Sequence, residues 1–516
     1  MITNTPMTTS PETTSTDSRP WRLLRAVLLT LGGLVTVTLV FYGIVDWRGH
    51  AAWDRMRQAA EAHGEKLEIA ALAPPAVPDD QNLAMCPMLK PALDYAKPPI
   101  GPIEWRDNKG YQRLEQINCT LEVQKPPRLG LVAEGATVDL AAWQTYYRGS
   151  TNYPQPSAPG RPAADILLAL SRFDGDLAEL RREAAARPLA RFPVQYASHP
   201  AVAILLRHLS VLGGLSRLLQ LRTAALLDLG RSQEAQADLE LNLRLSDAVS
   251  REPILVSQLV RKVILERSLE TLREGITHHV WTDAQLAGFA GELGKIDMLA
   301  EEKLGMQGEQ AFGVTTVEEL LTGSLRAGDL SDPANHVPAW IAMATVYGPR
   351  GWLYQNMAAV VDYHQRYNFP TVDVKLRRVF PDLCNQPLAN IINAPWTPSS
   401  FMVHLFIPAL GRATARSAQG QTMVDAARVA CAVERFRLAA AHLPAKLEEL
   451  VPKYLDQVPT DVIDGQPLRY HPQADGEAVI YSIGWNQRDD DGHATLGEDG
   501  TVQTQEGDWV WTVAAK

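Results

Sequence analysis

The residues best suited to chemistry are three consecutive carboxylates near the C-terminus, Asp489, Asp490 and Asp491. Hard divalent cations bind several oxygen ligands, which adjacent carboxylates supply. The stretch nearly matches an EF-hand loop, whose positions 1, 3, 5, 6 and 12 would be taken by Gln487, Asp489, Asp491, Gly492 and Glu498. Gln487 lacks the first carboxylate, however, and the preceding AVIYSIG has a strand pattern where an EF-hand has a helix. An EF-hand is therefore excluded, which leaves another kind of cation site or a solvated acidic turn.

Histidines provide the other candidate chemistry. His278 and His279 are adjacent on a predicted helix, where successive side chains point about 100° apart, so the two do not face one metal ion. A cationic helix end is the better interpretation. His364, beside Asp362 and Tyr363, is a candidate acid–base group, but the sequence identifies no nucleophile or pocket for it. The motifs H-E-x-x-H, G-x-S-x-G, G-x-G-x-x-G and the P-loop are absent.

The cysteines exclude several classes of site. Cys86, Cys119, Cys384 and Cys431 are the four cysteines, and none lies in a C-x-x-C pair. This spacing excludes zinc ribbons and thioredoxin-type motifs. Two alternatives remain: the disulfides Cys86–Cys119 and Cys384–Cys431, or buried free thiols that pack as small apolar groups.

Composition limits the general class of protein. A chain of 516 residues is expected to form two or three domains, and 46% hydrophobic with 21% charged residues is typical of a folded protein. The net charge of −10 lacks the basic surface that nucleic-acid binding requires. We therefore expect no nucleic-acid partner.

The N-terminal region predicts a membrane anchor. Residues 1–20 have the composition of a disordered tail, and a transmembrane helix is predicted over residues 23–46. The uncharged run Ala26–Val45 spans about 30 Å as a helix, which is the thickness of a bilayer's hydrocarbon core. The run is longer than the apolar core of a secretory signal peptide, and no A-x-A cleavage site follows it. We expect an uncleaved, single-pass helix.

The orientation of this helix depends on a few charges. Arg22 and Arg25 adjoin its N-terminal end, and the first charge beyond it is Asp46. The wider count of basic residues on the two sides does not decide the orientation. The adjoining charges favour a cytoplasmic N-terminus and an extracytoplasmic body.

Two regions of the body follow the anchor. Residues 47–160 are rich in proline and loops, apart from a helix predicted over 47–69 and another over 140–148. Residues 161–420 form a predicted helical body. Its first long helix has an apolar face at the spacing of three and four residues, formed by Leu205, Leu209, Leu212, Leu215, Leu219 and Leu226.

The helical body is predicted to consist of hairpins. Gly230 ends the first helix, and Pro253 opens a later one. Thr282 and Gln285 form a capping box for a helix over residues 282–304. Successive hairpins predict an irregular α-solenoid. One hairpin resembles a tetratricopeptide unit, whose small positions match Ala224, Gly230 and Ala235.

Residues 320–420 are predicted to be helical but are interrupted by prolines. The segments GPRGWLYQN and YHQRYNF supply aromatic and polar groups for either a groove or core packing between helices.

Residues 421–516 form a predicted α+β module. A helix precedes a short helix over 445–455, and three strands follow, at PLRY, AVIYSIG and WVWTV. The turn signal Asp464-Gly465 precedes the first strand.

Three segments of this module resemble the globular head of the major pseudopilin of type II secretion systems. They match that family in order and spacing, and they are Leu443–Leu455, Val458–Tyr470 and Ser482–Asp491. The end of the chain also resembles uncharacterised bacterial membrane-anchored helical proteins that carry a YSxGWN…DDxG signature. The apolar helix here lacks a carboxylate and lies far from the module, so the chain is not expected to be a pilus subunit.

The resemblance implies a calcium site. In pseudopilin heads the acidic loop binds calcium, and Asn486 stands where that family has an aspartate. The implied ligands are Asn486, Asp489, Asp490 and Asp491. A solvated acidic turn remains the alternative.

Together these features predict a mainly α protein with a small C-terminal α+β module and one transmembrane helix. The expected function is that of a non-enzymatic scaffold or protein-interaction protein, tethered to the bacterial inner membrane and binding an unknown protein partner. The alternatives are an envelope hydrolase with a site in residues 320–420 and an accessory factor of a secretion system.

Overall fold

The computed structural model describes residues 19–96, 103–117, 125–130, 137–330, 337–472, 477–498 and 501–513, and it is mostly helical with a few small sheets. The helices are α1 (Arg19–Ala62), α2 (Asn108–Ile117), α3 (Leu140–Arg148), α4 (Pro162–Leu170), α5 (Asp174–Ala186), α6 (Arg207–Asp228), α7 (Ser232–Asp247), α8 (Leu255–Thr277), α9 (Asp283–Leu293), α10 (Met298–Thr322), α11 (Ala339–Tyr347), α12 (Gly351–Tyr363), α13 (Pro381–Asn393) and α14 (Phe401–Ala440). The strands are β1 (Tyr95–Ala96), β2 (Glu104–Trp105), β3 (Val372–Asp373), β4 (Arg378–Val379), β5 (Arg469–Pro472), β6 (Ala478–Ser482), β7 (Ala494–Leu496), β8 (Val502–Gly507) and β9 (Trp509–Val513).

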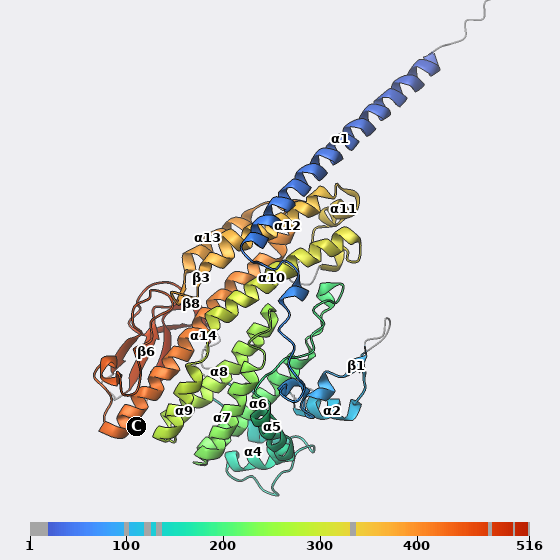
Figure 1. The fold of residues 1–516 in the computed structure, drawn as a ribbon. Coiled ribbons are helices and arrows are strands. Elements are labelled where there is room, and N and C mark those ends of the chain that lie inside the picture. The colour runs from blue at the N-terminus through green and yellow to red at the C-terminus, as the bar shows by residue number, and fades with distance from the viewer. Residues whose placement is uncertain are drawn as a thin grey trace, which may run out of the picture.

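The N-terminal helix α1 projects from one end of the body (Figure 1). Its apolar side chains from Trp21 to Ile44 are exposed around the whole helix, whereas its C-terminal part packs along α12. The helix predicted over 47–69 is wrong at both ends: α1 continues unbroken from the apolar run, it ends at Ala62, and a separate 3-10 turn follows at Ile69–Leu72. Among the described residues, the helical segments Trp21–Ala62 and Ala201–Asp228 are long and apolar enough to cross a membrane.

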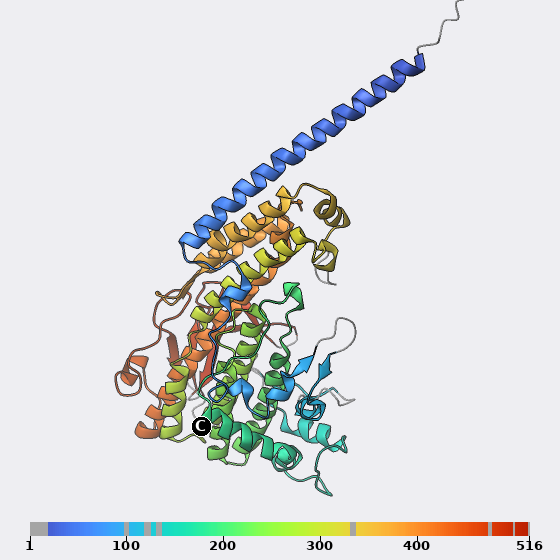
Figure 2. The same ribbon diagram turned by 45° about the vertical axis from the view of Figure 1, so that its right-hand side comes forward.

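The predicted hairpins are present from α6 onward. Helices α6, α7 and α8 pack against one another, and Gly230 separates α6 from α7 with a φ of +72°. Glycine adopts this left-handed conformation without steric cost. The 40-residue helix α14 packs across α8, α9 and α10 (Figures 1 and 2), a long-range pairing that a simple solenoid does not need. The solenoid therefore stays a prediction.

The helix predicted over residues 282–304 is two helices. The Thr282–Gln285 capping box does open α9, as predicted, but α9 ends at Leu293. The Asp297 side chain then accepts hydrogen bonds from the backbone N–H groups of Leu299 and Ala300 and starts α10. This second cap satisfies donors that a continuous helix would have bonded internally.

The three predicted C-terminal strands form one antiparallel sheet in the order β5-β6-β9, in which Ile480 lies opposite Trp511. A second antiparallel pair, β7-β8, was not predicted. The segment 445–455 is not the expected helix: it has only a 3-10 turn over Leu447–Leu450. Pro452 follows this turn, and proline cannot donate the next helical hydrogen bond.

The helical body and the C-terminal module share one core. Helix α14 runs through the boundary expected at residue 420, and it contacts β6 and β9 as well as α8 and α9. A single cluster of buried side chains extends from Leu269 through Val429 to Trp509 and Trp511. One hydrogen bond joins the β3–β4 hairpin to the module: the Val379 N–H donates to the Val462 carbonyl at 2.7 Å.

The structure gives Cys86, Cys384 and Cys431 as buried free thiols. The Cys384–Cys431 disulfide alternative is therefore wrong. Burial raises the pKa of Cys431 to about 12, as expected for an inert thiol packed among apolar groups. Cys119 lies outside the described residues.

Candidate functional site

The acidic loop after β6 is organised around Arg469 on β5. The Arg469 guanidinium donates to Asp489 at 2.9 Å, to Asp464 at 2.7 Å and to Asp461 at 3.3 Å. Tyr481 also donates its hydroxyl to Asp489, at 3.2 Å. Burial opposes ionisation, but the hydrogen bond and charge of Arg469 prevail and hold the pKa of Asp489 below its ordinary value. The Arg469 guanidinium thus already neutralises Asp489, the first carboxylate among the predicted calcium ligands.

The other predicted ligands face different groups. Asn486 donates its amide to Asp490 at 2.9 Å, which leaves the Asn486 side-chain oxygen to accept from the Arg488 N–H at 3.0 Å. Asp491 is exposed, with a φ of +56°. Within the described ranges there is no group of three or more His, Cys, Asp or Glu side chains placed to hold a metal ion. As arranged, the four residues do not form an oxygen cage, and the calcium site stays a prediction.

Two buried aspartates that sequence analysis missed hold this module together. The fully buried Asp461 accepts from the Ile463 and Ile483 N–H groups and from the Ser482 hydroxyl, at 2.8, 3.1 and 2.8 Å. Asp508, also fully buried, accepts from the Gly492 N–H at 2.7 Å. Burial raises the pKa of both carboxyls above the ordinary value, and the hydrogen bonds from these donors offset only part of that rise. Asp461 lies in Val458–Tyr470, the second segment that resembles the pseudopilin head, and that segment was the available signal.

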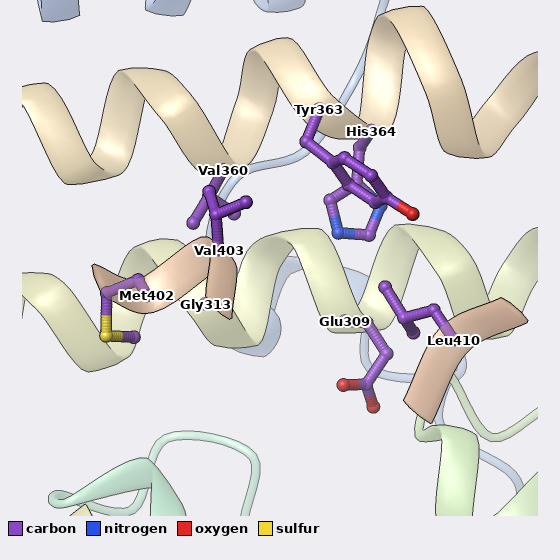
Figure 3. Close-up of a pocket in the computed structure, with 8 residues that line it drawn as sticks. All are labelled: Glu309, Gly313, Val360, Tyr363, His364, Met402, Val403 and Leu410. Atoms are coloured by element: carbon purple, nitrogen blue, oxygen red, sulfur yellow. The ribbon is translucent and has the colours of Figure 1, made fainter. Parts of the chain in front are cut away.

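A small cavity between α10, α12 and α14 contains the predicted acid–base residue His364 (Figure 3). Tyr363 and His364 approach it from the end of α12, and Glu309 faces it from α10. His364 begins a π-helical turn over His364–Asn368, and the Asn368 amide lies 2.9 Å from its Nδ1. Since that amide is a donor, Nδ1 accepts and the proton resides on Nε2. Asp362 instead pairs with Arg366 at 2.7 Å.

Burial sets the protonation of this cavity. It lowers the pKa of His364 to about 3 and raises the pKa of Glu309 to about 7. The cavity is thus lined by a neutral imidazole and by a carboxyl whose pKa is near 7, and the Glu309 carboxyl points away from the His364 ring (Figure 3). Glu309 was missed by sequence analysis, because nothing local distinguishes it from other helical glutamates.

The cavity is too small for a substrate. Its volume is about 10 Å³, close to the minimum for one water molecule. Its other lining residues are Gly313, Val360, Met402, Val403 and Leu410, none of which is a nucleophile. The aromatic segment around His364 serves core packing here.

The adjacent histidines also separate, but helical spacing is not the reason: α8 ends at Thr277, so both lie beyond it, and His279 has a φ of +52°. His278 is exposed at the end of α8, whereas the His279 Nδ1 lies 3.0 Å from the buried carboxylate of Glu434. The pair does not converge on one ion.

The most extensive described contact between distant parts of the chain joins α1 to α12 at the end of the apolar run. The Tyr42 hydroxyl donates to the Tyr347 carbonyl at 2.5 Å, and the Gly351 N–H donates to Asp46 at 2.6 Å. Gly49 packs so closely that an added Cβ would lie 2.3 Å from the Gly351 carbonyl oxygen. One turn further along α1, Trp53 is buried. Helix α1 is therefore fixed to the body immediately after its exposed apolar part.

Comparison with known proteins found no matching family model, no similar curated protein and no similar solved structure.

Proposed function

We propose that this chain is a membrane-tethered, non-enzymatic interaction protein of the bacterial envelope. The observation that carries the proposal is the division of α1 into two parts. The first part exposes apolar side chains on every face, which water does not favour and a bilayer does. The second part is packed against α12. The helix would thus span the inner membrane once and hold the extracytoplasmic body directly on its surface.

A signal sequence passes the same test of length and composition, so the proposal depends on retention of α1. The hydrogen bonds that Tyr42 and Asp46 form with the body support retention, since cleavage near residue 46 would remove them. The test is alkaline extraction of membranes together with the intact mass of the full chain. We expect an uncleaved chain that resists extraction. A shortened, extractable chain would contradict the tether.

A charged groove between α7, α8, α9 and α10 is a candidate surface for the protein partner. Its volume is about 580 Å³, and its charged lining includes Glu240, Arg244, Asp247, Glu292 and Lys295. Charges of both signs line this groove, where Arg244 pairs with Asp247 at 3.0 Å and Lys295 with Glu292 at 2.6 Å. Such a polar lining suits a polar peptide segment better than an apolar helix. This groove supports the interaction function, whereas the one-water cavity at His364 gives no support to the hydrolase alternative.

The partner is tested by photo-crosslinking in intact cells. Crosslinkers replace Glu240 and Lys295, which are exposed on the groove, and a control replaces the exposed Leu496 on β7. We expect one protein to crosslink from both groove positions and not from the control. Equal crosslinking from all three positions would contradict the groove.

A further inference from the structure

The outer face of α11 is entirely apolar. Its side chains Trp340, Met343, Val346 and Tyr347 are 54%, 58%, 61% and 68% exposed, while Ile341 on the opposite face is fully buried. The nine-residue helix contains no charged residue. A helix on the surface of a soluble domain normally turns its polar side to water, so this arrangement is inverted.

The position of α11 accounts for the inversion. The Tyr347 carbonyl accepts the Tyr42 hydroxyl at 2.5 Å, and Tyr42 lies near the end of the uncharged run of α1. Both ribbon views show α11 at the end of the body from which α1 projects (Figures 1 and 2). The apolar face of α11 is therefore level with the end of the apolar part of α1.

The geometry points to α11 as a second membrane contact that lies in the headgroup region of the bilayer beside α1. This inference rests on the proposed membrane tether and adds to it. Tryptophan and tyrosine are the side chains favoured at this depth, because an apolar ring is joined to a polar group. Trp47, just over one turn beyond Tyr42 on α1, is 72% exposed.

Charge supports a lipid occupant over a protein one. Exposed Arg48 and Arg350 follow the apolar parts of α1 and α11 on the side of the body. Cations at this position interact favourably with anionic headgroups. The continuity of the α11 face with an apolar surface that is already exposed all around α1 also favours a lipid layer, which contacts both at once.

The test measures depth by nitroxide labelling of the full chain. Met343→Cys labels α11, Leu34→Cys labels the middle of the apolar run, and Leu496→Cys labels an exposed site on β7. The parent chain, treated identically, corrects for labelling of its native cysteines. The protein is reconstituted into vesicles of phosphatidylcholine with a minority of phosphatidylglycerol, and label relaxation by oxygen, which partitions into lipid, is compared with relaxation by an aqueous nickel chelate.

We expect the Met343 label to be severalfold more protected from nickel than the Leu496 label, and shallower than the Leu34 label. A Met343 label as nickel-accessible as Leu496, with Leu34 deep in lipid, would overturn the α11 contact and leave the tether standing. Failure of the tether itself is a distinct result, in which the Leu34 label is also aqueous. A Met343 label shielded from both oxygen and nickel would show that a second copy of the chain covers α11, which also overturns the lipid contact.

Discussion

Helices α1 and α6 pass the same test for a membrane span, yet the structure uses them in opposite ways. The apolar side chains of α1 are exposed on every face, whereas Leu212, Leu215 and Leu219 of α6 are fully buried. Helix α6 is surrounded by α4, α7 and α8. It also buries Gln220, whose amide donates to the Gly130 carbonyl at 2.6 Å. The length of an apolar helix therefore does not by itself assign it to a membrane. What matters is whether other helices of the same chain bury its apolar side chains.

The sharpest way to break this comparison is to place a carboxylate in each helix. Leu215→Asp buries a charge without a partner among apolar side chains, and we expect a loss of about 4 kcal/mol or more. Leu34→Asp changes a side chain that touches no part of the body, and the body should unfold at the unchanged temperature. Melting followed by tryptophan fluorescence in detergent measures both. Equal destabilisation would show that α1 is part of the body's core.

The junction between the two parts of α1 is tested by adding one methyl group. A Cβ at Gly351 would lie 2.1 Å from the Val45 carbonyl oxygen, so Gly351→Ala must displace α1 from α12. We expect a loss of about 1–3 kcal/mol, together with faster proteolysis near residue 62. Gly43→Ala is the matched control, because nothing lies within 4 Å of its added Cβ. Similar effects of both substitutions would argue against a fixed junction.

A third test addresses the interior of the body by pH. Burial raises the pKa of Glu309 from 4.5 to about 7, so the folded chain binds more protons than the unfolded chain between these values. The stabilisation by this group is complete below pH 4.5 and is lost as the pH rises through 7. Glu309→Gln stays neutral, so this variant should lack a stability loss of about 3 kcal/mol that the wild type shows between pH 4.5 and 7.5.

The control for the pH test is Glu61→Gln, which removes a carboxylate whose side chain is 62% exposed on α1. Urea unfolding at a series of pH values gives the slope for each variant. A wild-type slope that persists in Glu309→Gln would assign the pH dependence to other groups.

The smallest expected effect concerns calcium at the acidic loop. The ion must compete with Arg469 for Asp489, so millimolar calcium should raise the melting temperature by only a few degrees. The double substitution Asp489→Ala/Asp491→Ala should remove that rise. An unchanged melting temperature in wild type would contradict the calcium prediction and leave Arg469 as the counter-charge of the loop.

Sequence patterns predicted those features that depend on neighbouring residues. The helix Leu140–Arg148, the Thr282–Gln285 capping box and the three strands of the C-terminal sheet were predicted correctly because local signals specify them. The cap at Asp297 was an available local signal that the continuous helical pattern obscured.

The features that sequence patterns missed depend on residues far apart in the chain. Gly49 packs against Gly351, and no pattern in the residues around either glycine indicates this contact. The charge on Asp489 is neutralised by Arg469, twenty positions away. The cavity beside Glu309 exists only because α10, α12 and α14 come together.

Because α1 is one continuous helix as far as Ala62, no flexible linker separates its apolar part from the body. In a bilayer, such a body would move laterally with its anchor but would neither swing nor extend its reach into the surrounding compartment. Its encounters would be confined to a thin layer above the lipid, where local concentration is set by surface density and not by bulk dilution. A partner would then have to come to the membrane, and it would always meet the same side of the body.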